Sequence, residues 1–315
     1  MRVVATLHVV LALSAMCFVM LRDLPGHSFV RNFNYGESTF QHYERIRKEF
    51  RPRVASTLAV RVFHTADAKE MRKRSAGYFT LLFALTCMLY LWLDVKAAPF
   101  LMVGTFAGVS YACSRVAEFI WHPWDFPALF LGALAIVLAL KRRFWATAAT
   151  VLVGVAFKET LLLYALLLPF IPKLSLRTRL ISTLTTIAGG LGLRFAIERA
   201  TRNPHGFDAF SYNINANPKL MFRWEENLNW LLETNWNHIL FVNLGTFLLV
   251  FFLPTRHPVL RAFKWGVVPL FYVGLFVAGS YNEFRVFLEA MPGALILLYG
   301  TLHGQDFPRF AAARA

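Results

Sequence analysis

Ionisable residues interrupt the apolar runs of this sequence at four places, and their types indicate phosphate chemistry. Arginine can hold a phosphate by two parallel hydrogen bonds and lysine as a point charge. A neighbouring carboxylate could act as general base for a hydroxyl group. The four clusters are 31–53, with Glu37, His42, Glu44, Arg51 and Arg53; His122–Asp125; Lys158–Thr160; and Asn282–Arg285, followed by Glu289.

The cluster Lys158–Thr160 stands in the middle of the apolar stretch Phe144–Pro172. A charged side chain at the centre of a membrane helix costs about 2.5–3.5 kcal/mol on insertion scales. Lys158 and Glu159 should therefore pair with each other across a hairpin, line a wet cavity, or bind a ligand.

Simpler interpretations exist for the other three clusters. Glu283 and Arg285 can snorkel at a helix end. Asp125 is a good N-cap for a helix that starts near Phe126. The charged segment around His42 suits a solvated amphipathic face. The meeting of these clusters at one end of a bundle, rather than any single residue, would therefore indicate a site.

The composition is that of a multi-pass membrane protein. Of 315 residues, 57% are hydrophobic and 16% are charged, whereas soluble domains are nearer about 45–50% apolar. Several apolar runs approach the roughly 20 residues that cross a bilayer as a helix, and backbone amides in lipid must bond within their own segment. We predict an all-α, polytopic transmembrane bundle with short or re-entrant helices, forming a single domain over residues 1–315 with outer loops near 22–51 and 200–237. The runs are Val3–Leu21, Tyr78–Leu93, Pro127–Leu140, Thr178–Ile197, Ile239–Leu253 and Phe284–Leu302.

The net charge of +15 comes from arginine and lysine between the apolar runs. This is the positive-inside pattern of membrane proteins, not that of a nucleic-acid-binding surface. Arg2 and Lys69 can share the cytoplasmic side only if the chain crosses once more between them, and Pro52–His64 is the candidate. The predicted cytoplasmic groups are Arg2, Lys69–Arg74, Lys141–Arg143, Lys173–Arg179, Arg256–Lys264 and Arg309–Arg314.

Positive groups on both sides of Phe144–Pro172 predict a hairpin of two short helices, with the Lys-Glu-Thr cluster at its outer tip. The same alternation places Asp94 and Asp125 outside. The run Pro99–Cys113 between them is then either re-entrant or a pair of short helices. The segments Thr201–Asn237 and Ser280–Arg285 are predicted to lie outside as well.

The first apolar run, Val3–Leu21, is longer than the about 7–15 residues of a signal-peptide core, so it is predicted to stay as the first helix. Cys17, Cys87 and Cys113 all lie in apolar runs, with no CxxC or Cys/His spacing. They are expected to pack as small apolar residues rather than to form a disulfide framework or a zinc site.

A phosphate bound at membrane level belongs to a lipid phosphate or a lipid pyrophosphate. Lys158, Arg285 and Arg53 are the candidate phosphate-binding residues, and Glu37 or Asp125 is a candidate base. Together they predict group transfer from a lipid-phosphate donor. The sequence has no glycine-rich phosphate loop, which agrees with a reaction that uses no nucleotide.

Four tracts carry a family resemblance by their order and spacing: Tyr43–Val62, Trp124–Arg143, Gly154–Leu163 and Glu283–Leu298. They resemble the GT-C superfamily of membrane glycosyltransferases, and more narrowly its bacterial mannosyltransferase-like members. The resemblance implies a bundle with several short helices and an outward-facing active site. It also implies a catalytic carboxylate on the first outer loop and inverting transfer from a polyprenyl-phosphate sugar.

The family's loop carboxylate is usually Asp, but no Asp lies between Asp23 and Asp67, so the resemblance implies Glu37 or Glu44 as the base. No metal is certain, although two well-placed carboxylates could hold Mg²⁺ or Mn²⁺. By the same resemblance, Lys158, Arg285 and Arg53 hold the lipid phosphate, and His122, Asp125, Glu159, Asn282 and Glu283 orient the substrate.

The expected partners are a polyprenyl-phosphate-linked sugar and membrane lipids, in a bacterial inner membrane with the site facing the periplasm or exterior. A transporter or flippase for a lipid-linked or anionic solute is one alternative, because broken helices with charged tips also occur there. Internal repeat symmetry would favour it, and none is found. A catalytically inactive membrane partner is the other alternative, favoured if Glu37 lies beyond a sugar's length from Lys158 and Arg285.

Overall fold

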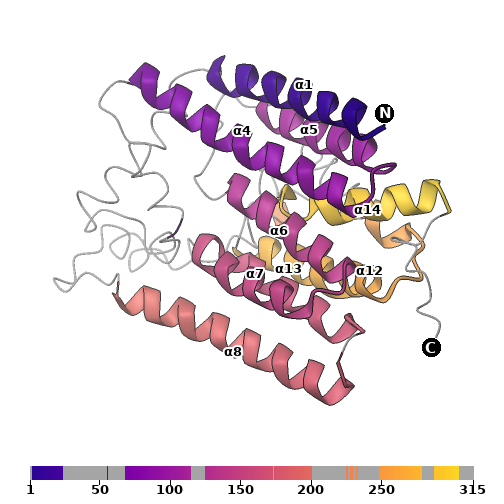
Figure 1. Ribbon diagram of the computed structural model, residues 1–315. Helices are drawn as coiled ribbons and strands as arrows, with labels where there is room; N and C mark the ends of the chain where they lie inside the picture. The colour runs from indigo at the N-terminus through magenta and orange to yellow at the C-terminus, as the bar shows by residue number, and fades with distance from the viewer. Residues whose placement is uncertain are drawn as a thin grey trace.

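The computed structural model describes residues 2–23, 68–114, 125–172, 174–200, 248–278 and 287–304, with a few single positions between them. This part of the chain is all-α and has no strand, which confirms the predicted fold class at that level. Figure 1 shows the helices lying side by side, roughly along one axis. Among the described residues, four helical stretches are long and apolar enough to cross a membrane, as expected for a multi-pass protein: Arg2–Arg22, Lys73–Leu93, Leu176–Ile197 and Pro258–Val277.

The described helices differ widely in length. At 1.5 Å per residue, α1, α4 and α8 rise roughly 33–39 Å, whereas α6 and α7 rise roughly 21–24 Å, less than the about 30 Å of a bilayer core. The elements are α1 Arg2–Asp23, α4 Ala68–Leu93, α5 Ala98–Ser114, α6 Asp125–Leu140, α7 Phe144–Phe157, the 3₁₀ helix η2 Glu159–Phe170, α8 Leu176–Ala200, α12 Pro258–Ala262, the π-helix η4 Phe263–Val267, α13 Val268–Ala278 and α14 Met291–Leu302.

The short helix α6 lies at the centre of the bundle. Nearly all of its residues are buried, and it packs against α4, α7, η2 and α14. A helix that is apolar on every side is stable only inside such a bundle. The outer helices α1 and α8 are the opposite case, because only 17% of each candidate span is buried.

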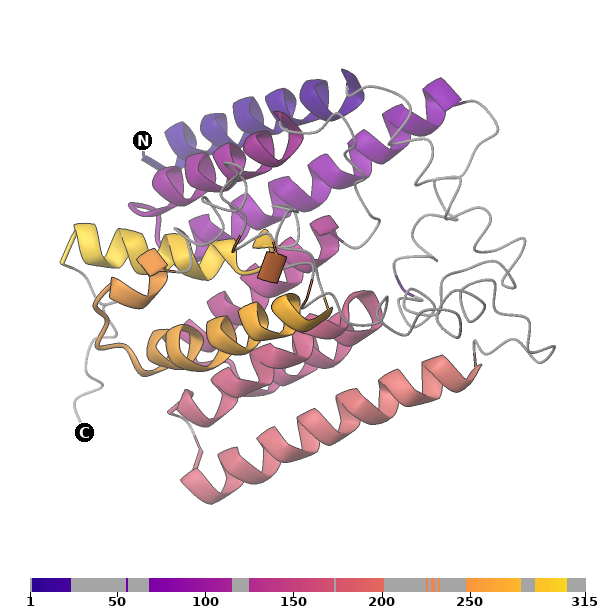
Figure 2. The same ribbon diagram turned by 180° about the vertical axis from the view of Figure 1, so that it is seen from behind.

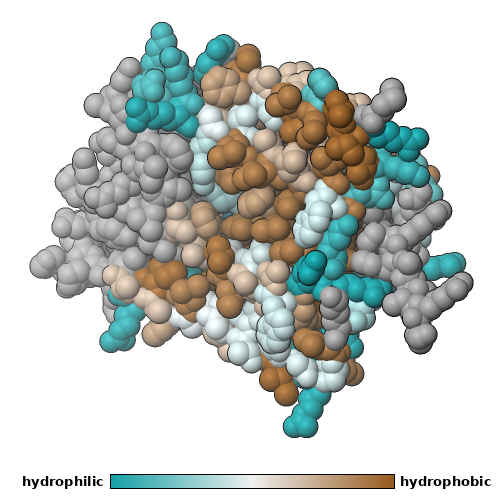
Figure 3. All heavy atoms as spheres, viewed as in Figure 1, coloured by the Kyte–Doolittle hydropathy of each residue, from teal (hydrophilic) through white to brown (hydrophobic). Residues whose placement is uncertain are grey.

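The long helix α4 shows how an outer helix divides its faces. Phe79 and Phe83 are buried, whereas Leu81, Leu85 and Met88 are exposed in a stripe at helical spacing. In Figure 3 exposed apolar side chains cover the middle of the molecule and hydrophilic ones gather toward its two ends. This division fits a bundle whose middle is surrounded by lipid.

One end of the bundle, at the right in Figure 1, is strongly basic. The start of α1 lies there, together with the α4–α5, α6–α7 and η2–α8 connections. The positive-inside rule predicts that this is the cytoplasmic end. Its basic residues include Arg2, Lys96, Lys141, Arg142, Arg143, Arg177, Arg179, Arg256 and Arg261.

The basic group Lys69–Arg74 lies at the opposite end, so the prediction that it shares a side with Lys141 is wrong. Lys141 Nζ lies 5.8 Å from the ring centre of Trp92, at the C-terminal end of α4, and the basic group is at the N-terminal end of that helix. Arg74 Nε lies 3.1 Å from Glu70 Oε1, one turn earlier. This carboxylate offsets part of the positive charge on which the prediction relied.

The predicted extra crossing at Pro52–His64 is not required. Helix α1 ends and α4 begins at the same end of the bundle, as Figures 1 and 2 show from opposite sides, and the two helices pack together. Apart from Ala55, the segment Pro52–His64 lies outside the described residues.

Asp94 was predicted to lie outside, but it lies at the basic end. Its Oδ1 accepts hydrogen bonds from the backbone N–H groups of Lys96, at 2.6 Å, and Ala97, at 3.3 Å. Asp94 thus forms the tight turn from α4 to α5, a usual role for this residue type. The run Pro99–Cys113 forms the single helix α5. Its two ends lie at opposite ends of the bundle, so the run is neither a re-entrant segment nor a pair of short helices.

The predicted hairpin of two short helices is confirmed: α7 and η2 pack together and are joined at Lys158. Its other end is held at the basic side, where Arg179 Nη1 donates a hydrogen bond to the carbonyl oxygen of Pro169. A 3₁₀ helix rises about 2.0 Å per residue, so the 12 residues of η2 span roughly the same height as the 14 residues of α7.

Thiol labelling tests this arrangement of ends. Lys73 and Lys96 are both exposed and lie at opposite ends of α4. With the native cysteines replaced by alanine, a membrane-impermeant maleimide added outside should label Lys73→Cys but neither Lys96→Cys nor Arg143→Cys. Labelling of Lys73→Cys and Arg143→Cys from the same side would contradict the arrangement.

Candidate functional site

The cluster Lys158–Thr160 lies at the tip of the α7–η2 hairpin, away from the basic end. Helix α7 ends at Phe157, and Lys158 is extended, with φ −156° and ψ 129°. Its backbone N–H still donates to the carbonyl of Gly154 at 2.8 Å. A Cβ on Gly154 would lie only 3.0 Å from Leu161 Cβ, so glycine there lets η2 fold back closely on α7.

Lys158 forms a buried ion pair with Glu289. Lys158 Nζ lies 3.4 Å from Glu289 Oε1, and the two side chains are 7% and 1% exposed. This separation exceeds the about 2.7–2.9 Å of a charge-assisted hydrogen bond, so the contact is mainly electrostatic. Thr160 Oγ1 supplies the hydrogen bond, donating to Glu289 Oε2 at 2.9 Å.

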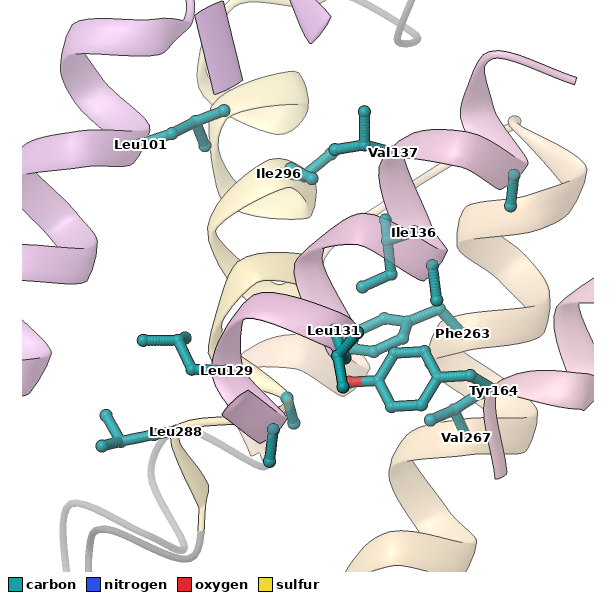
Figure 4. Close-up of a cluster of buried hydrophobic side chains, with 14 of the residues drawn as sticks. Leu101, Leu129, Leu131, Ile136, Val137, Tyr164, Phe263, Val267, Leu288 and Ile296 are labelled. Carbon is teal, nitrogen blue, oxygen red and sulfur yellow. The ribbon is translucent and has the colours of Figure 1, made fainter. Parts of the chain in front are cut away.

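The backbone of Glu289 accepts a hydrogen bond, as its side chain does. The Tyr164 hydroxyl donates to the Glu289 carbonyl oxygen at 2.6 Å. A Cβ on Gly132 would lie 2.8 Å from that oxygen and 3.0 Å from the hydroxyl, so only glycine leaves room for this bond. Figure 4 shows the Tyr164 ring beside that of Phe263, with its hydroxyl end toward Leu131; the centres of the Tyr164 and Phe263 rings are 6.4 Å apart.

Glu289 lies in a turn before α14, although the predicted last apolar run, Phe284–Leu302, would place it inside a helix. The apolar run suggests a helix from Phe284, but α14 begins at Met291, with Pro292 in its first turn. Proline favours the first turn of a helix, where the N–H group that it lacks would have no partner within the helix. The helix therefore starts late, and the Glu289 carboxylate meets the hairpin tip.

Glu159 pairs with Arg194 of α8. The Nη1–Oε2 distance is 2.8 Å, and the side chains of Arg194 and Glu159 are 24% and 38% exposed. The predicted alternative in which Lys158 and Glu159 pair with each other is therefore wrong, because each pairs with a different segment. Arg194 was not among the predicted site residues, although an arginine so far inside the run Thr178–Ile197 was the signal that could have found it.

Asp125 is the first residue of α6 and is buried, in agreement with its predicted place at a helix start. It lies two turns before Gly132, roughly 10 Å along the helix axis. The other predicted site residues lie outside the described residues: Glu37, Glu44, Arg53, His122, Asn282, Glu283 and Arg285.

Within the described segments, no three or more His, Cys, Asp or Glu side chains converge as metal ligands would. Glu159 and Glu289 each face a different basic residue. They therefore do not fit a shared Mg²⁺ or Mn²⁺ site, which needs carboxylates directed at one point.

No protein-family model, curated protein or solved structure matches the chain. The candidate site is the hairpin tip, where the consecutive residues Lys158 and Glu159 form a buried pair with Glu289 and a partly exposed pair with Arg194.

Removing one member of the buried pair should be far more harmful than removing both. Lys158→Met or Glu289→Gln alone leaves a buried charge without its partner, and such changes cost about 3–5 kcal/mol. The double variant leaves neither charge and should recover most of this loss. Unfolding in mixed detergent micelles measures the three values.

The exposed pair Glu70–Arg74 on α4, 40% and 44% exposed, is the matched control. Glu70→Gln and Arg74→Met should each change stability by roughly 0.5 kcal/mol or less. Equal, additive losses at the two pairs would show that the Lys158–Glu289 contact is not a coupled buried pair.

Gly132→Ala should destabilise the protein by about 1–3 kcal/mol, because the added methyl group separates Tyr164 from the Glu289 carbonyl. The loss should shrink in a Tyr164→Phe background, where that hydrogen bond is already absent. Gly274→Ala, on α13 with no atom within 4 Å of its Cβ position, is the control and should be neutral or stabilising by up to about 1 kcal/mol. Equal effects of Gly132→Ala in both backgrounds would contradict the shared contact.

Proposed function

We propose that the protein is a membrane glycosyltransferase that moves a sugar from a polyprenyl-phosphate donor to a hydroxyl acceptor on the non-cytoplasmic side. The observation that carries the proposal is the pair of ion pairs at the hairpin tip, Lys158–Glu289 and Glu159–Arg194. Ionisable groups at membrane depth are expensive and usually functional.

The depth of the tip supports a lipid-linked substrate. The cytoplasmic surface is marked by Lys141–Arg143, and α7 carries the chain roughly 21 Å from it, short of the about 30 Å of a bilayer core. The reacting head of a lipid-linked sugar reaches such a depth with its chain still in the membrane. A water-soluble nucleotide sugar would have to enter from outside.

In the proposed reaction a carboxylate, Glu37 or Glu44, removes the proton of the acceptor hydroxyl. The acceptor oxygen attacks the anomeric carbon of the sugar. The bond from that carbon to the phosphate oxygen breaks, and polyprenyl phosphate leaves with the bonding electron pair. The configuration at the anomeric carbon inverts. Basic side chains stabilise the charge that develops on the leaving phosphate.

The buried pair has a supporting role in this proposal. A phosphate that approached Lys158 would compete with Glu289, which already balances the lysine charge from 3.4 Å. The pair and Thr160 instead hold the hairpin tip against the turn before α14. This leaves Glu159, the next residue along, directed toward α8, where a substrate can reach it.

A carrier of an anionic lipid or solute is the second candidate, favoured by the extended Lys158 between α7 and η2. Interrupted helices with charged groups at the break line transport sites. The two functions differ in whether the bound lipid loses its sugar.

Native mass spectrometry of the detergent-purified protein separates the two functions. The wild type should carry polyprenyl phosphate and its hexosylated form, and Arg285→Ala should lose both, because the arginine holds the phosphate. Glu37→Gln or Glu44→Gln should raise the ratio of hexosylated to free polyprenyl phosphate, since the variant that lacks the base keeps its donor.

Glu70→Gln is the control for the loss of one carboxylate at an exposed position, and it should leave the ratio unchanged. Ordinary phospholipids bound equally by all variants would overturn the transferase proposal. A bound lipid-linked sugar whose ratio is insensitive to both glutamates would favour the carrier.

A further inference from the structure

The pair Arg194–Glu159 differs from the other ion pair at the tip because it is open to the surroundings of the bundle. Its side chains are 24% and 38% exposed, against 7% and 1% for Lys158 and Glu289. Because the pair is partly exposed, a ligand from outside the bundle can reach it.

The surroundings of Arg194 are apolar. Leu191, Leu193 and Phe195 on the same stretch of α8 are 56%, 36% and 66% exposed. Among the described elements, α8 packs mainly against η2 and α7, and only 17% of its candidate span is buried. A ligand that reaches Arg194 across this surface comes from the membrane.

Arg194 lies near the non-cytoplasmic end of α8. The apolar span of α8 is Leu176–Ile197, so Arg194 lies within one turn of its non-cytoplasmic end. A guanidinium at this level meets the phosphate layer of the outer leaflet, because hydrocarbon ends near the last apolar turn.

The Arg194 guanidinium has more N–H donors than its contact with Glu159 uses. Within the described residues its one hydrogen bond runs from Nη1 to Glu159 Oε2, and the other N–H groups make no bond to these residues. Arginine binds phosphate through two parallel N–H groups. Glu159 occupies part of the site that such a phosphate would need.

We propose that Arg194 binds the phosphate of a membrane lipid, and that Glu159 is the resident anion which that phosphate displaces. Two anions compete for one cation, so the carboxylate sets how tightly the phosphate is held. The inference deepens the proposed function and rests on it for the identity of the lipid, a polyprenyl monophosphate.

The competition predicts effects of opposite sign at the two partners. Arg194→Gln removes the charge-assisted bonds and should weaken binding of polyprenyl monophosphate about tenfold or more. Glu159→Gln removes the competing anion and should tighten it several-fold. A role of the pair in stability alone predicts weaker binding, or none, in both variants.

Titration of polyprenyl monophosphate into the full-length protein in phosphatidylcholine nanodiscs measures these affinities. Arg199→Gln, which removes an exposed cation in the last turn of α8, controls for net charge and should leave the affinity within about twofold of the wild type. Glu70→Gln is the matching acidic control. A gain in Glu159→Gln is not an effect that misfolding produces, so this variant keeps the test decisive.

Weakening by both Arg194→Gln and Glu159→Gln, or no change in either, would overturn the assignment. The same would follow if inorganic phosphate bound with this pattern while the lipid phosphate did not. Opposite-signed shifts without any bound or transferred sugar would uphold the lipid-phosphate site and overturn only the transferase proposal.

Discussion

The low dielectric of the bundle interior makes an unpaired charge at the hairpin tip untenable, and the buried pair Lys158–Glu289 is the consequence on which the other features of the tip depend. Desolvation of each ion costs several kcal/mol, and the attraction offsets this only in good geometry. The partner comes from a turn more than a hundred residues further along the chain, and Thr160, Tyr164 and Gly132 fix that turn from both sides. The contacts around the pair thus join the α7–η2 hairpin, the central helix α6 and the turn before the last helix, α14, at one point.

Helix length is the second constraint, and it sets the depth of that point. The inner helices α6 and α7 are shorter than a bilayer core, while α4 and α8 exceed it. The charged tip is therefore held below the level that the outer helices reach. Consecutive residues then have different surroundings: Lys158 turns inward to Glu289, and Glu159 turns outward to Arg194 on α8.

Local patterns predicted the all-α membrane fold and the hairpin, because apolar runs and the charged break at Lys158 are properties of nearby residues. The ends of α4 were assigned to the wrong sides, because charge counting does not see that Glu70 offsets Arg74 or that Asp94 forms a turn. Sequence patterns could not predict which side chains pair with Lys158 and Glu159 at the hairpin tip. Pairing of Lys158 with Glu289, and of Glu159 with Arg194, follows from how segments far apart in the chain pack, which no spacing encodes.

The contact between Lys158 and Glu289 can be measured directly by solid-state nuclear magnetic resonance of the protein in lipid, with ¹⁵N at lysine Nζ and ¹³C at glutamate Cδ. A measurable through-space dipolar coupling is expected, since Lys158 Nζ lies 3.4 Å from Glu289 Oε1. It should disappear in both Lys158→Met and Glu289→Gln and persist in Glu159→Gln. A coupling lost in Glu159→Gln but kept in Glu289→Gln would mean that the two tip residues pair with each other, and would contradict the arrangement of the tip.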